Sequence, residues 1–163
     1  MSNWLGQIVQ ANITPDDTVL DFGCGIQQAN VDIVCKSCLG VDIFDNYLNH
    51  VKNRINTVKL DMSETDRFMD KSYDVVICLD VVEHLEIDLA LKVIDECKRI
   101  ARRKAIIYTP AIFKDNMEAV DNAWDMGYNE HQKHLCVLSK PYFHEMGYHV
   151  DRPSGDDLLA IWD

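Results

Sequence analysis

Short apolar segments that recur between helix-like stretches constrain the fold of this chain more than any other feature. Five of them stand at positions 18–22, 39–43, 58–60, 73–79 and 104–108. Brief, nearly continuous apolar runs are typical of parallel strands that are buried on both faces. Because strand and helix patterns alternate, we expect βαβ units and therefore an α/β fold with a mostly parallel, doubly wound sheet.

Helical spacing of apolar residues predicts the main elements between and before these strands. The chain opens with a short amphipathic helix that is expected to end near Asn12. The clearest helical pattern covers residues 86–102 and places its apolar side chains on one stripe. Arg99, Arg102 and Arg103 near the end of this helix would complement the helix dipole.

The C-terminal part of the chain predicts a different arrangement. Ser139 is placed to cap a helix that begins near Lys140 and ends at Gly147. Two strands over residues 148–152 and 158–162 follow, separated by a turn-forming stretch. We expect these two strands to pair as a terminal antiparallel hairpin.

Composition narrows the range of partners. The chain carries 16 Lys and Arg against 27 Asp and Glu, and its net charge of −11 disfavours binding to nucleic acid. No stretch approaches the roughly 20 apolar residues of a membrane helix, and the start does not resemble a secretory signal. We therefore expect a cytoplasmic protein without a membrane partner, folded as one domain over residues 1–163. The sequence leaves its oligomeric state open.

The six cysteines are expected to be reduced thiols, given the size of the chain and the expected compartment. Two patterns resemble parts of a zinc site. Cys35 and Cys38 stand in a Cys-x-x-Cys pair, while His131, His134 and Cys136 form a His-x-x-His-x-Cys pattern. Neither pattern has a convincing complement of further ligands in the sequence, so we expect no metal.

An aspartate follows or ends each of the first four predicted strands. These residues are Asp21, Asp42, Asp61 and Asp80, spaced by about 20 residues, which is the length of one βα unit. Ligands of open parallel sheets bind outside the carboxyl ends of the strands. The four carboxylates are therefore expected to lie along one edge of the sheet around a shared crevice, although each alone is also common at strand ends and helix caps.

The turn after the first strand, VLDFGCGIQQ, distinguishes between two classes of ligand. Gly23 and Gly25 match two glycines of the dinucleotide fingerprint, and Asp42 matches its ribose-binding acid. Gln28 replaces the third glycine, and Asp21 places negative charge beside the turn. The pattern favours a ligand with a ribose and a positive charge, and it disfavours the alternative of a nicotinamide-dependent oxidoreductase.

S-adenosylmethionine has this combination of groups, and the chain resembles the class I S-adenosylmethionine-dependent methyltransferases over nearly its whole length. VLDFGCG is similar to the glycine motif of the family, LGVDI to its ribose-binding strand and KLDMSE to its adenine-contacting segment. YDVVICLDVVEHLE is similar to the fourth-strand motif, which commonly ends in Glu-His. The resemblance implies a Rossmann-like fold whose seven-stranded sheet is parallel except for one strand of the C-terminal hairpin.

The resemblance also implies roles for individual residues. Asp21 would reach the amino group of the cofactor, Asp42 would accept from both ribose hydroxyls, and Asp61 would receive the adenine amine. The chain departs from the family at Gln27, where a glycine is common, and His84 is expected to pack beside the cofactor. The residues expected to contact S-adenosylmethionine are Asp21, Gly23, Cys24, Gly25, Gln27, Asp42, Ile43, Asp61, Met62, Leu79, Asp80 and His84.

The long segment between the fifth strand and the last helix, residues 109–138, is rich in aromatic residues and is expected to form an ordered cover over the substrate. A hydroxyl nucleophile benefits from a general base, and histidine is suited to that role. His131 and His134 are therefore the candidate bases, with Tyr108 as a candidate positioning group. The alternative is that both histidines are surface or capping residues.

The identity of the methyl acceptor is only weakly constrained by the sequence. The Asn/Asp-Pro-Pro-Tyr type of motif found in amino-methylating DNA enzymes is absent after the fourth strand, where LDVV stands instead. A small-molecule acceptor is the first expectation and a protein side chain the second, with O-, N-, S- and C-directed transfer all open. The alternative function is a regulatory module that binds S-adenosylmethionine without catalysis.

Overall fold

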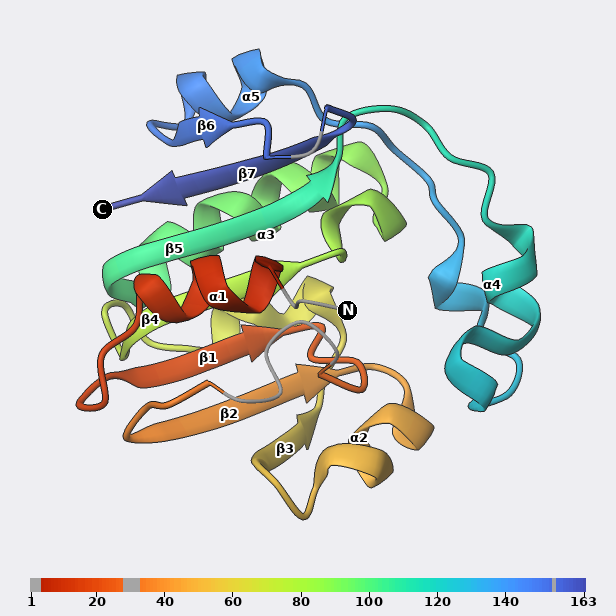
Figure 1. The fold of residues 1–163 in the computed structure, drawn as a ribbon, viewed down its shortest axis with the longest axis horizontal. Coiled ribbons are helices and arrows are strands. Elements are labelled where there is room, and N and C mark those ends of the chain that lie inside the picture. Colours follow the sequence, from red (N-terminus) through yellow and green to blue (C-terminus); the bar gives the residue numbers. More distant parts are fainter. Residues whose placement is uncertain (1–3, 28–32, 154) are drawn as a thin grey trace.

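A computed structural model of the chain describes residues 4–27, 33–153 and 155–163, and Gln28 lies outside these ranges. Its seven strands form one sheet in the order β3-β2-β1-β4-β5-β7-β6 (Figure 1). The strands are β1 Thr18–Phe22, β2 Ser37–Asp42, β3 Asn56–Lys59, β4 Tyr73–Leu79, β5 Ala101–Pro110, β6 His149–Asp151 and β7 Asp157–Trp162. The strand pairs β3-β2, β2-β1, β1-β4 and β4-β5 are parallel.

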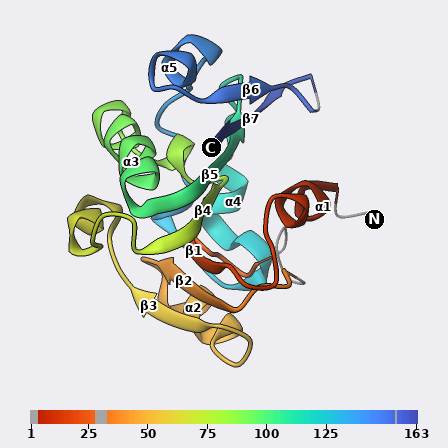
Figure 2. The same ribbon diagram turned by 90° about the vertical axis from the view of Figure 1, so that its left-hand side faces the viewer.

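Helices cover both faces of the sheet, and Figure 2 shows α1 and α3 on opposite sides of it. One face packs in a large apolar core with α3, and the other packs in a second core with α1. The α-helices are α1 Trp4–Ala11, α2 Asp45–Val51, α3 Ile87–Ile100, α4 Met117–Asn122 and α5 Lys140–Glu145. The expected doubly wound α/β architecture is confirmed.

The end of α3 corrects one prediction. The helix stops at Ile100, and Ala101 already pairs with Tyr73 as the first residue of β5. Arg102 and Arg103 therefore lie in the strand, although helical spacing placed them in the last turn of the helix. Their guanidinium groups form ion pairs with carboxylates at the edge of the sheet, Arg102 with Asp74 and Arg103 with Asp17.

The C-terminal hairpin is confirmed. Strand β7 is antiparallel to both of its neighbours, β5 and β6, and it lies between them in the sheet. Gly147 follows α5 with a φ of +83°, a backbone conformation that favours glycine. Ser139 precedes α5 as expected, but its side chain makes no capping hydrogen bond, since Pro141 has no N–H and the N–H of Tyr142 donates to the backbone carbonyl of Ser139 at 3.1 Å.

The sheet places the carboxyl ends of its central strands along one edge of the molecule. Strands β1, β2 and β4 all run towards this edge, and the segment that contains α4 lies beyond it (Figure 1). Over the described ranges of the chain, the longest and most apolar helices fall short of what crossing a membrane requires. The edge where the parallel strands end is the place to look for a ligand site.

Candidate functional site

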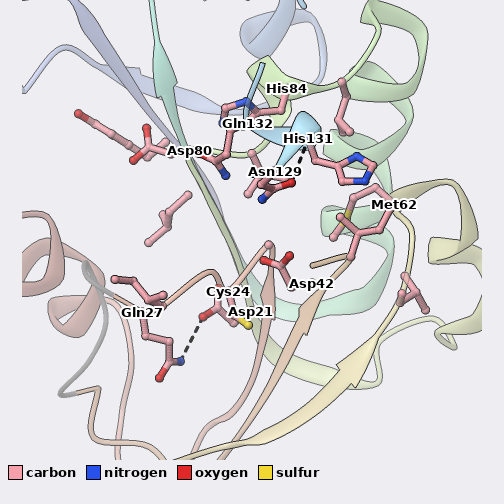
Figure 3. Close-up of a pocket in the computed structure, with 18 of the residues that line it drawn as sticks. Asp21, Cys24, Gln27, Asp42, Met62, Asp80, His84, Asn129, His131 and Gln132 are labelled. Carbon is pink, nitrogen blue, oxygen red and sulfur yellow. Dashed lines mark hydrogen bonds between the residues drawn. The ribbon is translucent and has the colours of Figure 1, made fainter. Parts of the chain in front are cut away.

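A cavity of about 680 Å³ opens at the carboxyl ends of β1, β2 and β4 (Figure 3). The lining contains every residue expected to contact the cofactor except Gly25. The structure therefore brings together side chains from four separate motifs around a single hollow, as the spacing of the aspartates predicts.

The charge of the lining is one-sided. Among the described residues, the cavity is lined by the carboxylates of Asp21, Asp42, Asp61, Asp80 and Glu86 and by no lysine or arginine. A phosphate chain would meet uncompensated negative charge there, whereas a cation would be attracted. The lining therefore matches the positively charged ligand that the glycine turn predicts.

The glycine turn after β1 follows a path that glycine requires at one position. Gly23 has a φ of +66°, and a Cβ atom at this position would lie 2.3 Å from Cγ2 of Val81. The turn thus packs directly against the residues that follow β4. A side chain here would clash with Val81 and also strain the backbone.

Gln27 stands where a glycine is common in the family that the chain resembles. Its φ is +57°, in the left-handed region, and its backbone N–H donates to the carbonyl of Cys24 at 2.9 Å. The backbone therefore adopts the kind of conformation that a glycine would favour at this position. The side chain is buried, and its Nε2 donates to Oδ2 of Asp21 at 3.3 Å, so the amide holds Asp21 in place (Figure 3).

Asp42 holds the turn together as well as facing the cavity. Its Oδ2 accepts from the backbone N–H of Gly25 at 3.0 Å, and its Oδ1 accepts from that of Phe44 at 2.9 Å. Burial raises the pKa of the Asp42 carboxyl, and the backbone hydrogen bonds partly offset this effect. A carboxylate can accept further hydrogen bonds, so these contacts leave room for a ligand hydroxyl.

Asp61 begins the short 3-10 helix η1, Met62–Arg67. Its Oδ1 accepts from the backbone N–H of Ser63 at 2.8 Å. Hydrogen bonds from the hydroxyl and the backbone of Ser63 lower the pKa of the Asp61 carboxyl. The residue is therefore a fixed, ionised acceptor at the cavity wall.

The turn after β4 carries two acidic groups that interact with each other. Asp80 has a φ of +53°, while Glu83 on the 3-10 helix η2, Val82–His84, is 2% exposed. Oε2 of Glu83 accepts from the hydroxyl of Thr109 at 2.9 Å. Burial and the charge of Asp80 raise the pKa of Glu83, and burial and the charge of Asp157 raise that of Asp80.

The sequence places Glu83 in the fourth-strand motif without indicating a role for it. In the sequence Glu83 cannot be told from an acid on the surface. In the structure it is buried and contacts Thr109 of β5 and the backbone of Leu135 and Cys136. Its backbone carbonyl accepts from the N–H groups of Leu135 and Cys136 at 2.7 and 3.2 Å. The residue therefore joins the end of β4 to a distant part of the chain.

The residues considered for catalysis occupy different places. His131 lines the cavity on the side of Asp42 and Met62 (Figure 3), whereas His134 is not among the residues that line it. The ring of His134 packs edge-on against that of His84, with 4.8 Å between centroids. Tyr108 lines the cavity and is 8% exposed. The two histidines therefore do not act at one point.

Residues 109–138, which we call the cover segment, lie along the open side of the cavity. They include α4 and the 3-10 helices η3, Ala123–Asp125, and η4, Glu130–Gln132. The ring of Trp124 contacts that of Tyr47 at 5.4 Å between centroids. The members of this segment that line the cavity are Trp124, Asn129, His131, Gln132 and Leu135, and of these the sequence gives a catalytic role to His131 alone.

Comparisons with known proteins agree with this geometry. The model of a protein family described as "Methyltransferase domain" matches residues 20–109, which is more than half of the chain. A "Ubiquinone biosynthesis O-methyltransferase" of Rickettsia bellii (strain OSU 85-389) is 33% identical over 84 residues. That match covers 46% of this chain and 34% of the relative, so the chain spans about a third of the length of the curated relatives that it matches.

Solved structures share the fold at low sequence identity. A protein of Pyrococcus horikoshii OT3 has a TM-score of 0.70 at 17% identity, covering 98% of this chain and 87% of that chain. The magnesium protoporphyrin IX methyltransferase from Synechocystis PCC 6803, solved with bound SAH, has a TM-score of 0.65 at 16% identity, covering 97% and 78%. Likeness at this level of identity supports the fold alone.

Proposed function

This chain belongs to the methyltransferase domain family, and we propose that it binds S-adenosylmethionine and transfers the methyl group to a small molecule, with S-adenosylhomocysteine as product. One observation carries the proposal. The cavity at the carboxyl edge of the sheet is lined by carboxylates and, among the described residues, by no lysine or arginine. This lining favours a cationic adenosine sulfonium compound over a pyrophosphate-bearing dinucleotide.

In this proposal the acids and the glycine turn hold the cofactor. Asp42 accepts the ribose hydroxyls, and the segment from Asp61 to Met62 contacts the adenine. Gly23 lets the backbone approach the methionine part, and Asp21, held by Gln27, attracts its ammonium group. The cavity lining supplies a suitable group for each part of the ligand.

The protein's contribution to the reaction is alignment and exclusion of water. Bound S-adenosylmethionine supplies a methyl carbon attached to a sulfonium, which is an excellent leaving group. Leu79 and Asp80 at the end of β4 are assigned to the wall next to this centre, and the cover segment closes the opposite side. Holding the acceptor in line with the methyl group is what such a site adds to the rate.

A small-molecule acceptor fits the cavity best, with a protein side chain as the second choice. Leucines 85, 89 and 135 line the cavity together with Tyr108, so part of the wall is apolar. Similar proteins include a ubiquinone biosynthesis O-methyltransferase and a magnesium protoporphyrin IX methyltransferase. All six cysteines are free, which supports a reducing compartment such as the cytoplasm.

Calorimetric titration tests the binding half of the proposal. We expect S-adenosylhomocysteine to bind and NAD not to bind. Asp42→Ala is expected to weaken the affinity about 5- to 150-fold, the equivalent of about 1–3 kcal/mol for hydrogen bonds to a charged group. Asp45→Ala is the control, because Asp45 is exposed and pairs with exposed Lys59.

Catalysis is tested separately, by following S-adenosylhomocysteine release with a panel of phenolic, amine and thiol acceptors. Release with one acceptor class would identify the chemistry. Binding without release from any acceptor would instead support a non-catalytic regulatory module. Equal affinity of wild type and Asp42→Ala, or preferential binding of NAD, would contradict the assignment of the cavity.

A further inference from the structure

Three side chains with metal-binding groups converge at the wall of the cavity. Glu83 and His84 come from η2, and His134 comes from the cover segment. One carboxylate oxygen and one nitrogen from each ring all lie within 4.8 Å of one another. Glu83 is buried, and the two histidines are half-buried. This grouping shares only His134 with the zinc patterns that the sequence suggests.

The kinds of ligand indicate which ions would fit. Two imidazoles and one carboxylate form the ligand set of catalytic zinc sites that keep a position open, and of related transition-metal sites. In a tetrahedral zinc site, ligand atoms at about 2.1 Å from the ion lie about 3.4 Å from one another, so a pair at the 4.8 Å limit needs to draw together by about 1.4 Å.

Neighbouring groups already orient the ligands. Nδ1 of His84 lies 3.2 Å from the carbonyl oxygen of Lys133. A carbonyl only accepts, so Nδ1 carries the proton in this hydrogen bond and the neutral ring keeps a lone pair on its other nitrogen. Glu83 accepts from the hydroxyl of buried Thr109 at 2.9 Å. Carbonyl and hydroxyl partners of this kind fix metal-binding side chains in proteins.

The backbone also brings the two ligand-bearing segments into register. The carbonyl of Glu83 accepts from the N–H groups of Leu135 and Cys136, and Sγ of Cys136 donates to the carbonyl of Val82 at 3.3 Å. An ion at this point would therefore join segments that already lie side by side. These backbone contacts therefore already supply most of the ordering that would bring the ligands together.

We propose that Glu83, His84 and His134 bind one divalent transition-metal ion, with zinc as the preferred ion, and that this ion ties the cover segment to the turn after β4. His84 also lines the cavity, so metal binding would fix part of its wall. The proposal does not depend on methyl transfer, because it is tested by metal binding. None of the three ligands is one of the aspartates assigned to the cofactor, although Glu83 interacts with Asp80.

The test uses the full chain after treatment with a chelator and dialysis. Titration with Co²⁺ is followed by visible absorption, Zn²⁺ is then added as a competitor, and bound zinc is measured by elemental analysis. We expect one ion per chain and a rise in Tm on adding zinc, because the ion binds only the folded state. His134→Ala is expected to reduce the affinity at least about 100-fold, since even partners of metal ligands contribute about 10- to 100-fold.

Two variants make the result interpretable. His144→Ala removes an exposed histidine of α5 and should bind zinc like the wild type. Glu83→Gln should also lose affinity while keeping the volume of the side chain. Less than one ion per chain in the wild type at micromolar zinc, or equal affinity in His134→Ala and His144→Ala, would overturn the proposal. Titration of the same variants with S-adenosylhomocysteine reports on the methyltransferase proposal separately.

Discussion

The two sides of the cavity are built in different ways. On the side of β1 and β2, Asp42 accepts backbone hydrogen bonds from Phe44 and Gly25, which are 2 and 17 residues away in the chain. On the side of the turn after β4, Glu83 is held by Thr109, Leu135 and other residues that are distant in sequence. The first side is therefore encoded in local motifs, whereas the second exists only once the fold is complete.

The two sides approach each other closely at Gly23. Gly23 of the glycine turn faces Val81 of the turn after β4, and there is no space for a Cβ atom between them. If this contact sets the spacing of the two sides, a change there should damage the site more than any other single change. Substitutions at this contact, inside the cavity and at the opposite ends of the strands can therefore test how the two sides are held together.

Gly23→Ala is expected to have the largest effect. An alanine at φ +66° costs about 1–2 kcal/mol, and displacing Val81 from a well-packed position adds about 1–3 kcal/mol. We expect the free energy of unfolding to fall by about 2–5 kcal/mol in urea titration, together with a loss of S-adenosylhomocysteine binding. Both follow from pushing the two sides of the cavity apart.

Gly147→Ala is the matched control for this change. Gly147 also has a positive φ, of +83°, but a Cβ atom there would have no neighbour within 4 Å. It should lose only the backbone share, about 1–2 kcal/mol, and keep its ligand affinity. If the two variants were equally unstable and both bound ligand normally, the close approach of Gly23 to Val81 would not matter for the site.

The bounds of a strand were predictable from the sequence where burial on both faces determines which residue types occur. Strands β1 and β4 have the predicted bounds because both are buried on both faces and read as continuous apolar runs. The junction at Ala101 was not predictable. Helix α3 passes into β5 without a break, and only pairing with Tyr73, which is distant in sequence, makes Ala101 part of a strand.

The site was predictable to the extent that it depends on strand ends. The four aspartates gather at one cavity because parallel strands end at one edge. The separation of His131 from His134 was not predictable from their spacing. Helix η4 ends at Gln132, and Lys133 is extended, with φ −67° and ψ 131°, so the two histidines diverge although they are close in sequence.

His131→Ala tests whether this residue contributes to cofactor binding or to catalysis. Because His131 lies towards Asp42 and Met62 (Figure 3), we expect it to act on the cofactor side. Its loss should weaken S-adenosylhomocysteine binding about 5- to 10-fold, equivalent to about 1–1.4 kcal/mol, and change the maximal rate by less than about 3-fold. Calorimetry measures the first quantity, and steady-state kinetics the second.

The opposite pattern would support the role of general base considered from the sequence. In that case the maximal rate would fall by about 100- to 10,000-fold while the affinity for S-adenosylhomocysteine stayed the same. His50→Ala is a suitable control, because His50 is an exposed residue of α2. It should change neither quantity.

Replacing Asp74 tests whether contacts at the beginning of β1, β4 and β5, away from the cavity, also set the distance between the two sides of the cavity. This residue of β4 accepts hydrogen bonds from the backbone N–H and hydroxyl of Thr18 on β1, at 2.8 and 2.7 Å. It also accepts from Arg102 of β5 at 3.1 Å. The contacts to Thr18 and Arg102 lower the pKa of Asp74 to about 2.

A lowered pKa in the folded state stabilises the protein above the unfolded pKa of about 3.9, and this contribution is lost as the pH falls towards 2. We expect Asp74→Asn to reduce the free energy of unfolding by about 1 kcal/mol at pH 7, allowing for partial exposure of the side chain. The difference from wild type should shrink in urea titrations below pH 4. Asp70→Asn, which removes an exposed partner of Arg99, should cost less.

Ligand affinity decides what the Asp74 result means. If the contact of Gly23 with Val81 sets the spacing of the cavity, Asp74→Asn should bind S-adenosylhomocysteine within about 2-fold of the wild type, because a stable native state keeps its site. A loss as large as that expected for Asp42→Ala would mean that ties at the far edge of β1, β4 and β5 also align the two sides. Both sides of the cavity would then depend on the whole sheet. They would differ only in how far apart in the sequence their contacting residues lie.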